Sequence, residues 1–237
     1  MYKKILLLWM CILTALAGGL NAISIIGYNA TTVSHITGLL SKMAVFTSIQ
    51  SWEFLWETFK VVFAFFIGAI VSGFVTGERA FYLNKRYGFI IIAIGVLIII
   101  PYFLSVKYSI LMFAFLMGLQ NGMVVSFKGV VVRMTHMSGN LTDLGVFIGY
   151  KLKGNNNEKA FTGLIPMAAL ISFFIGGVIA VASYQAIKNN IFIIYSIVYI
   201  IVGCLYFLLR YKCDDKNFND IPDELEKEYE EEKTHLE

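Results

Sequence analysis

Two polar stretches about a hundred residues apart are near copies of each other. Ser34 to Phe46 reads SHITGLLSKMAVF, and Thr135 to Phe147 reads THMSGNLTDLGVF. Five positions are identical, and three positions exchange only Ser for Thr. Each copy interrupts a strongly apolar sequence, so the pair predicts a duplicated fold organised around two polar breaks.

The sequence around these stretches has the composition of a helical membrane protein. Its 237 residues are 58% hydrophobic and 15% charged, whereas about a quarter of the residues of an average soluble domain are charged. Its apolar runs of 18 or more residues are typical of membrane-spanning helices. The run 89–100 lacks the alternation of a membrane β-strand. We therefore expect an all-α integral membrane protein whose main partner is the lipid bilayer.

The helices are expected to form two repeats of three spans each. The apolar runs predict spans at about 5–28, 58–77, 88–106, 108–127, 161–184 and 190–211. The duplication extends beyond the polar stretches, because 18–22 resembles 118–122 and 65–68 resembles 173–176. Repeat 1 covers about 5–106 and repeat 2 about 108–211. Since three is odd, the second repeat enters the membrane from the opposite face, which predicts inverted repeats.

The distribution of Lys and Arg predicts the orientation. With a cytoplasmic N-terminus, thirteen basic residues of 1–216 lie inside and four, Lys42, Lys60, Lys107 and Lys188, lie outside. An eight-span model with parallel repeats would place the basic residues of 79–86 outside, against the positive-inside rule. We expect a membrane domain over 1–212 in the cell (inner or plasma) membrane. Both termini are then cytoplasmic, including the acidic tail 213–237.

Residues 29–50 and 128–150 are too polar to cross the membrane, so each is predicted to be a re-entrant break followed by a half-helix. Thr37 and Ser138, which precede Gly38 and Gly139, are placed to cap these half-helices. The free amides at such a helix start favour an anion or a polar ligand. The alternative is a tight polar turn that joins the repeats without a ligand.

Several polar residues near the breaks are candidates for substrate binding. The intramembrane amides either bond across helices or contact a ligand, and Arg133 either contacts a ligand or anchors the cytoplasmic side. The candidate residues are Asn21, His35, Thr37, Gly38, Gln120, Asn121, Arg133, His136, Ser138, Gly139 and Asn140. No carboxylate or cysteine recurs near both histidines, so no metal and no cofactor is expected. The glycines of 68–77 and 176–177 are predicted to be helix-packing sites.

These motifs resemble the YoaK-like family of bacterial multipass inner-membrane proteins, whose function is unknown. The second half carries the family's Gly-x-Gln-Asn element at 118–121, its Val-Arg at 132–133 and its hydroxyl-Gly-x-Leu-Thr-x-Leu-Gly element at 138–145. The first half departs from it, because Asn21 and Leu39 stand where the family favours Asp and Asn. The resemblance covers about 5–211 and implies a multipass membrane fold whose second half is the better preserved.

The sequence excludes several function classes. No phosphate-binding loop, dinucleotide fingerprint, HExxH or G-x-S-x-G motif is present, so we expect no enzyme. The basic excess follows the inside bias rather than a clustered basic face, so we expect no nucleic-acid partner. The expected function is a small secondary transporter or channel-like protein for a small polar or anionic solute, with a homodimer possible. The alternative is a non-transporting scaffold or partner-binding subunit whose helix breaks are only structural.

Overall fold

The computed structural model describes residues 2–28, 31–77, 85–123, 125–127, 130–132, 134–155 and 159–213, so the acidic tail after Cys213 lies outside the described residues. Most of them are helical. The helices are α1 (Tyr2–Gly27), α2 (Ile36–Ser48), α3 (Trp52–Thr76), α4 (Lys85–Leu97), α5 (Val106–Asn121), α6 (Met137–Leu152), α7 (Ala160–Ile187) and α8 (Ile191–Cys213). Two short 3-10 turns, η1 (Ile100–Tyr102) and η2 (Lys188–Asn190), complete the helical part.

The described helices are compatible with a membrane protein. Three helical segments, Leu7–Gly27, Trp52–Thr76 and Ala160–Leu208, are long and apolar enough to cross a bilayer, and the last of these joins α7 to α8. Exposed aromatic side chains line α3, among them Phe63 and Phe74, which are 50% and 86% exposed. Apolar side chains on the outer surface suit contact with lipid rather than water. The prediction of a helical, membrane-compatible chain is confirmed.

A short β-hairpin departs from the all-α prediction. Strands β1 (Val125–Phe127) and β2 (Val130–Val132) pair antiparallel, with Val125 opposite Val132. The fourth span, predicted to run to residue 127, therefore ends at Asn121, and this part of the prediction is wrong. The residues after it are rich in valine, whose branched side chain favours strands over helices.

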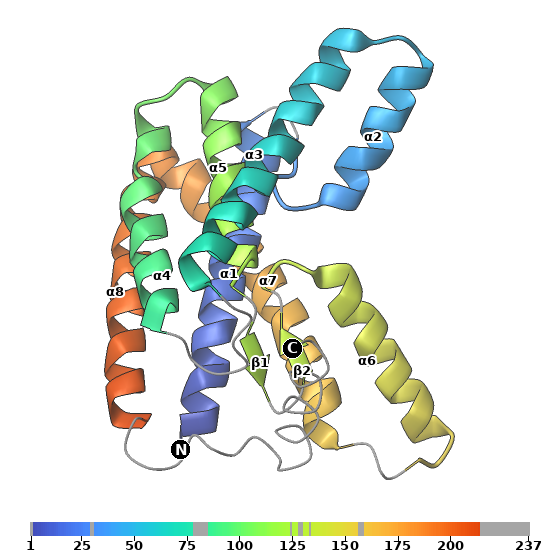
Figure 1. Ribbon diagram of the computed structural model, residues 1–237, viewed down its shortest axis with the longest axis vertical. Helices are drawn as coiled ribbons and strands as arrows, with labels where there is room; N and C mark the ends of the chain where they lie inside the picture. Colours follow the sequence, from blue (N-terminus) through green and yellow to red (C-terminus); the bar gives the residue numbers. More distant parts are fainter. Residues whose placement is uncertain are drawn as a thin grey trace, which may run out of the picture.

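The long helices pack in three pairs. α1 packs against α7, α3 against α5, and α4 against α8. Figure 1 shows α4 beside α8 on one side of the molecule, with α2 and α6 on the other. In terms of the predicted repeats, the first helix of each packs against the second helix of the other, and the two third helices pack together. The halves are thus interlocked rather than side by side.

Glycines at equivalent positions make these contacts close. A Cβ on Gly18 in α1 would overlap the carbonyl oxygen of Phe173 in α7, and a Cβ on Gly118 in α5 would overlap that of Phe65 in α3. Gly118 follows Gly18 by 100 residues, and Phe173 follows Phe65 by 108. The same backbone-to-backbone contact therefore occurs once in each pair of helices. Close approach of this kind needs a residue without a side chain.

Each of these helix pairs also has a glycine on the opposite helix that makes the same kind of contact, and the α4–α8 pair has close glycine contacts too. Gly176 would overlap the carbonyl oxygen of Ala15, and Gly68 that of Phe115. Between α4 and α8, a Cβ on Gly95 would lie 2.8 Å from Ile200 Cγ1. In the same pair, a Cβ on Gly203 would lie 2.6 Å from Ile92 Cγ1.

Not every predicted packing glycine is at a contact. A Cβ on Gly73 would meet nothing within 4 Å, and Gly77 ends α3 with a positive φ of 79°. The interpretation of this Gly-x-x-x-Gly pair as a packing motif is therefore wrong: Gly73 faces open space and Gly77 supports the end of the helix.

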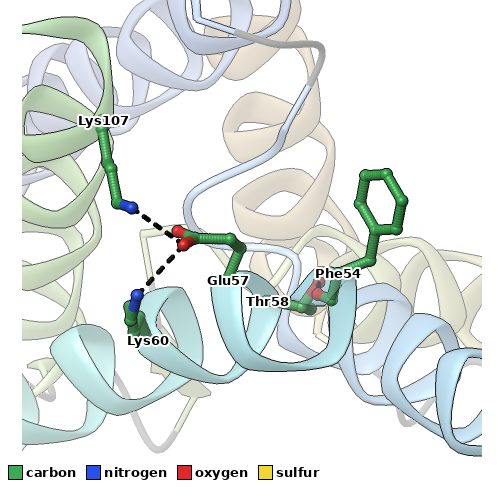
Figure 2. Close-up of polar contacts among 5 residues, drawn as sticks. All are labelled: Phe54, Glu57, Thr58, Lys60 and Lys107. Atoms are coloured by element: carbon green, nitrogen blue, oxygen red, sulfur yellow. Dashed lines mark hydrogen bonds and ion pairs between the residues drawn. The ribbon is translucent and has the colours of Figure 1, made fainter. Parts of the chain in front are cut away.

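A cluster of charged residues joins α3 to α5 near one end of these two packed helices. Figure 2 shows the Glu57 carboxylate between two ammonium groups, at 2.9 Å from Lys107 Nζ and 3.0 Å from Lys60 Nζ. Beside it, the Thr58 hydroxyl donates a 2.8 Å hydrogen bond to the Phe54 carbonyl. The Glu57 side chain is 42% exposed, so these ion pairs add little to the stability of the fold. They align the neighbouring ends of α3 and α5.

Candidate functional site

The two polar stretches adopt nearly the same backbone where their helices begin. The N-cap residues are His35, with φ −89° and ψ 69°, and His136, with φ −87° and ψ 63°. From these points α2 and α6 run away from the centre of the molecule in opposite directions, so their N-terminal ends face the same region (Figure 1). The two polar stretches are therefore similar in local structure as well as in sequence.

The predicted capping role of Thr37 and Ser138 is wrong. The N-cap residues are His35 and His136, two positions before the predicted caps, and neither makes a side-chain capping hydrogen bond. The histidine instead lies over the glycine of the first turn: a Cβ on Gly38 would lie 2.6 Å from His35 Nδ1, and one on Gly139 would lie 2.9 Å from His136 Cδ2. Gly38 and Gly139 therefore make room for an imidazole, and neither histidine side chain caps the first-turn amides. The first amide of α6, that of Met137, donates to the Thr135 carbonyl at 3.0 Å.

A cavity of about 1010 Å³ lies at the facing ends of α2 and α6. Residues at equivalent positions of the two predicted repeats line it in pairs: Asn21 with Asn121, Ser34 with Thr135, His35 with His136, Thr37 with Ser138, and Phe65 with Phe173. Its apolar wall also includes Phe174 and Val178 of α7. None of the described residues that line it is Asp, Glu, Lys or Arg. The described lining is therefore polar at the breaks and apolar elsewhere.

The first half of the site is closed by its own hydrogen bonds. The Asn21 Oδ1 atom accepts from the backbone N–H groups of Val33 and Ser34, both at 3.1 Å. The Asn21 Nδ2 atom donates to the Ser34 hydroxyl and, at 3.4 Å, to the Ala17 carbonyl. Asn21 is 6% exposed. One buried amide thus fixes the chain between α1 and α2, by bonds to its own helix and to the segment that follows rather than across to another helix.

The second half of the site is open. Three of the five buried side-chain atoms that have no hydrogen-bond partner among the described residues lie in this half: Asn121 Oδ1, Thr135 Oγ1 and Asn140 Nδ2. Thr135 is 8% exposed and Asn140 7% exposed. Asn121 and Thr135 line the cavity, at the positions equivalent to Asn21 and Ser34. Buried polar atoms without partners are costly and uncommon, so this half of the site calls for an explanation.

Gln120 lies away from the cavity. Its Nε2 atom donates to the Leu13 carbonyl at 2.9 Å, and its Oε1 atom accepts from the Tyr199 hydroxyl at 2.7 Å. Both contacts are buried and join α5 to α1 and α8. Gln120 therefore holds helices together, which is one of the two roles that the sequence left open.

The other predicted residues fall into three groups. Asn21, His35, Thr37, Asn121, His136 and Ser138 line the cavity together. Gly38, Gly139 and Asn140 lie in the first turns of α2 and α6 without lining it, and Arg133 lies outside the described residues. The cavity is also lined by four residues that were not predicted, Ser34, Thr135, Phe65 and Phe173, although all four stand in the segments that match between the halves.

Among the described residues, no group of three or more His, Cys, Asp and Glu side chains is placed to hold a metal ion. The arrangement offers hydrogen bonds, helix N-terminal amides and an apolar wall. Such a site suits non-covalent binding of a small molecule.

Comparison with known proteins places the chain in a family. The family model described as "Protein of unknown function (DUF1275)" matches residues 9–205. The chain belongs to this family. The match spans α1 to most of α8 and so includes both polar stretches and the cavity of this DUF1275 protein. No curated protein and no solved structure matches the chain.

Proposed function

We propose that this DUF1275 protein is a small secondary transporter or channel-like protein that carries a small polar or anionic solute through the central cavity. The observation behind this proposal is the pairing of the lining residues: equivalent positions of the two halves meet around one space of about 1010 Å³. Solute sites of transporters built from inverted repeats lie between the repeats in this way. In the alternative, a scaffold or partner-binding subunit, the breaks would need no cavity.

The proposal includes six membrane-spanning helices in two inverted repeats, with α2 and α6 as half-helices after re-entrant breaks. Three features support it: the interlocked helix pairs, the repeated glycine contacts, and the opposite directions of α2 and α6. α2 has 13 residues and α6 has 16, which correspond to about 20 and 24 Å. Neither is long enough to cross a hydrocarbon core of about 30 Å. The YoaK-like assignment rests on the motifs alone.

Three features of the lining support a polar or anionic solute. The described lining contains no carboxylate that would attract a cation by its charge. Two helix N-termini face it with uncapped amides, which favour negative charge. The aromatic wall offers only apolar contact, so polar contacts at the breaks decide which small polar molecule binds.

Binding can be tested by thermal unfolding of the purified protein with a library of ions and metabolites. A solute at a hundred times its Kd stabilises the folded state by about 2.7 kcal/mol, which raises the unfolding midpoint by about 5–10 °C. We expect such a shift in the wild type and a much smaller one in Asn121→Ala. The matched control is Gly145→Ala on α6, where a Cβ meets nothing within 4 Å. Shifts of equal size in Asn121→Ala would contradict this site, and binding without uptake into proteoliposomes would favour the scaffold.

Orientation can be tested by cysteine labelling in a variant from which Cys11, Cys204 and Cys213 have been removed. Lys188 and Lys153 are both exposed, and they lie at opposite ends of the helical hairpin of α6 and α7. With a cytoplasmic N-terminus, Lys188→Cys should react with an impermeant maleimide in intact cells, whereas Lys153→Cys should react only after the membrane is opened. The reverse pattern would overturn the proposed orientation.

A further inference from the structure

The two halves of the cavity differ in one respect that their sequences do not predict. Asn21 and Asn121 occupy equivalent positions, yet the Asn21 amide is fully engaged by the chain that follows it, whereas Asn121 Oδ1 is buried without a partner. The same holds for the hydroxyls: Ser34 accepts a hydrogen bond from Asn21, and Thr135 Oγ1 is buried without a partner. In the first half-site, formed by Asn21 and Ser34, the polar groups bond to the protein itself. In the second, formed by Asn121 and Thr135, two polar atoms have no partner.

That capacity defines the groups that a ligand must carry. A carboxamide oxygen only accepts, so Asn121 Oδ1 requires an N–H or O–H group on the ligand. The Thr135 hydroxyl both donates and accepts, and the first-turn amides of α6 only donate. These donors suit a negatively charged oxygen, which a helix N-terminus also favours. A ligand that satisfies this half-site therefore combines an oxyanion with a neighbouring hydrogen-bond donor.

The rest of the cavity argues for a small organic molecule. Its volume of about 1010 Å³ is far more than an inorganic oxyanion fills, and Phe65, Phe173 and Phe174 line its wall. Among the described residues that line it, there is no lysine or arginine to neutralise a multiply charged anion. A single carboxylate next to apolar carbon atoms fits both the polar half-site and the aromatic wall.

We propose that the second half-site, formed by Asn121, Thr135 and the N-terminus of α6, binds the head of a small monocarboxylate that carries a hydroxyl or amino donor next to its carboxylate. The donor bonds to Asn121 Oδ1, and the carboxylate bonds to the Thr135 hydroxyl and to the amides of Ser138 and Gly139, since those of Met137 and Asn140 already donate to backbone carbonyls. The apolar part of the ligand lies against the phenylalanines. The first half-site, closed by Asn21, acts as a fixed wall. This inference rests on the proposed function and adds the substrate class to it.

Three probes with the same three-carbon skeleton test the proposal on the purified full-length protein. Lactate, alanine and propionate are three-carbon carboxylates with a hydroxyl, an amino group and no donor at the second carbon. We expect lactate or alanine to bind about tenfold or more tighter than propionate in thermal-shift titrations, because loss of the donor leaves a buried acceptor unpaired. Asn121→Leu should bring all three to the same affinity. Thr135→Val should weaken all three and keep the donor preference.

The control is Ser48→Ala on α2, because the exposed Ser48 hydroxyl bonds to its own helix and lies outside the cavity. It should bind like the wild type, and its melting curve, like those of the two variants above, reports whether the protein is folded. Equal affinity for the three probes in the wild type would overturn the donor requirement. No shift with any of them, when another compound of the wider library shifts the midpoint, would overturn the substrate class and leave the proposed function standing. No shift with any compound would count against both.

Discussion

Replacing Gly118 by alanine should cost about 3 kcal/mol or more of stability and lower the unfolding midpoint by roughly 10 °C. The added Cβ would overlap the backbone carbonyl of Phe65, and a backbone cannot rotate aside as a flexible side chain can. The α3–α5 pair has to separate, which also breaks the reverse contact of Gly68 with Phe115. Size-exclusion chromatography of the detergent extract and a thermal melt measure the loss.

Two glycines on α3 provide a matched comparison. Gly68→Ala should behave like Gly118→Ala, since its Cβ would overlap the Phe115 carbonyl. Gly73→Ala lies on the same helix with nothing within 4 Å, so it should be neutral or up to about 1 kcal/mol stabilising, as alanine is the better helix former. If Gly68→Ala and Gly73→Ala had the same effect, the close contact between α3 and α5 would be refuted.

The contrast between Gly68 and Gly73 shows what the sequence leaves open in a membrane protein. In a soluble helix, the polar face identifies the surface and the apolar face the core. In α3 both faces are apolar: Val61 is buried, and Phe63 and Phe66 are exposed. Hydrophobic periodicity therefore predicts the helix without predicting its orientation. The repeat supplied part of that information, because the Phe-Phe-Ile-Gly segments that match between the halves contain both Phe65 and Gly68.

Like the packing of α3, the candidate site could be predicted only in part from the sequence. Duplication of the polar stretches predicted that the histidines and hydroxyl residues of both copies belong to one site, and six of the predicted residues line the cavity. The hydrogen bonds of the asparagine and glutamine side chains were not predictable, because they depend on the path of the chain after α1 and α5. Asn21 meets the backbone of Val33 and Ser34, and the equivalent Asn121 keeps an unbonded oxygen. Gln120, beside Asn121 in sequence, bonds to α1 and α8 instead.

This asymmetry predicts opposite roles for two equivalent asparagines. Asn21→Ala should destabilise the ligand-free protein by about 2–4 kcal/mol, because it leaves the N–H groups of Val33 and Ser34 without their acceptor. Asn121→Ala should change the stability of the ligand-free protein by less than about 1 kcal/mol, since the oxygen it removes has no partner among the described residues. Thermal melts of the two variants without ligand, under identical conditions, measure the difference.

Asn21→Asp separates the bonding role of Asn21 from its volume. A carboxylate or carboxyl group keeps an oxygen that accepts from the Val33 and Ser34 N–H groups, so Asn21→Asp should retain most of the stability that Asn21→Ala loses. The retained part measures the two backbone hydrogen bonds, and the remainder measures the Nδ2 contacts with Ser34 and Ala17.

If Asn21→Ala and Asn121→Ala lowered the unfolding midpoint equally, the two halves of the cavity would be equivalent in solution. The first could then not serve as a fixed wall for a ligand held by the second.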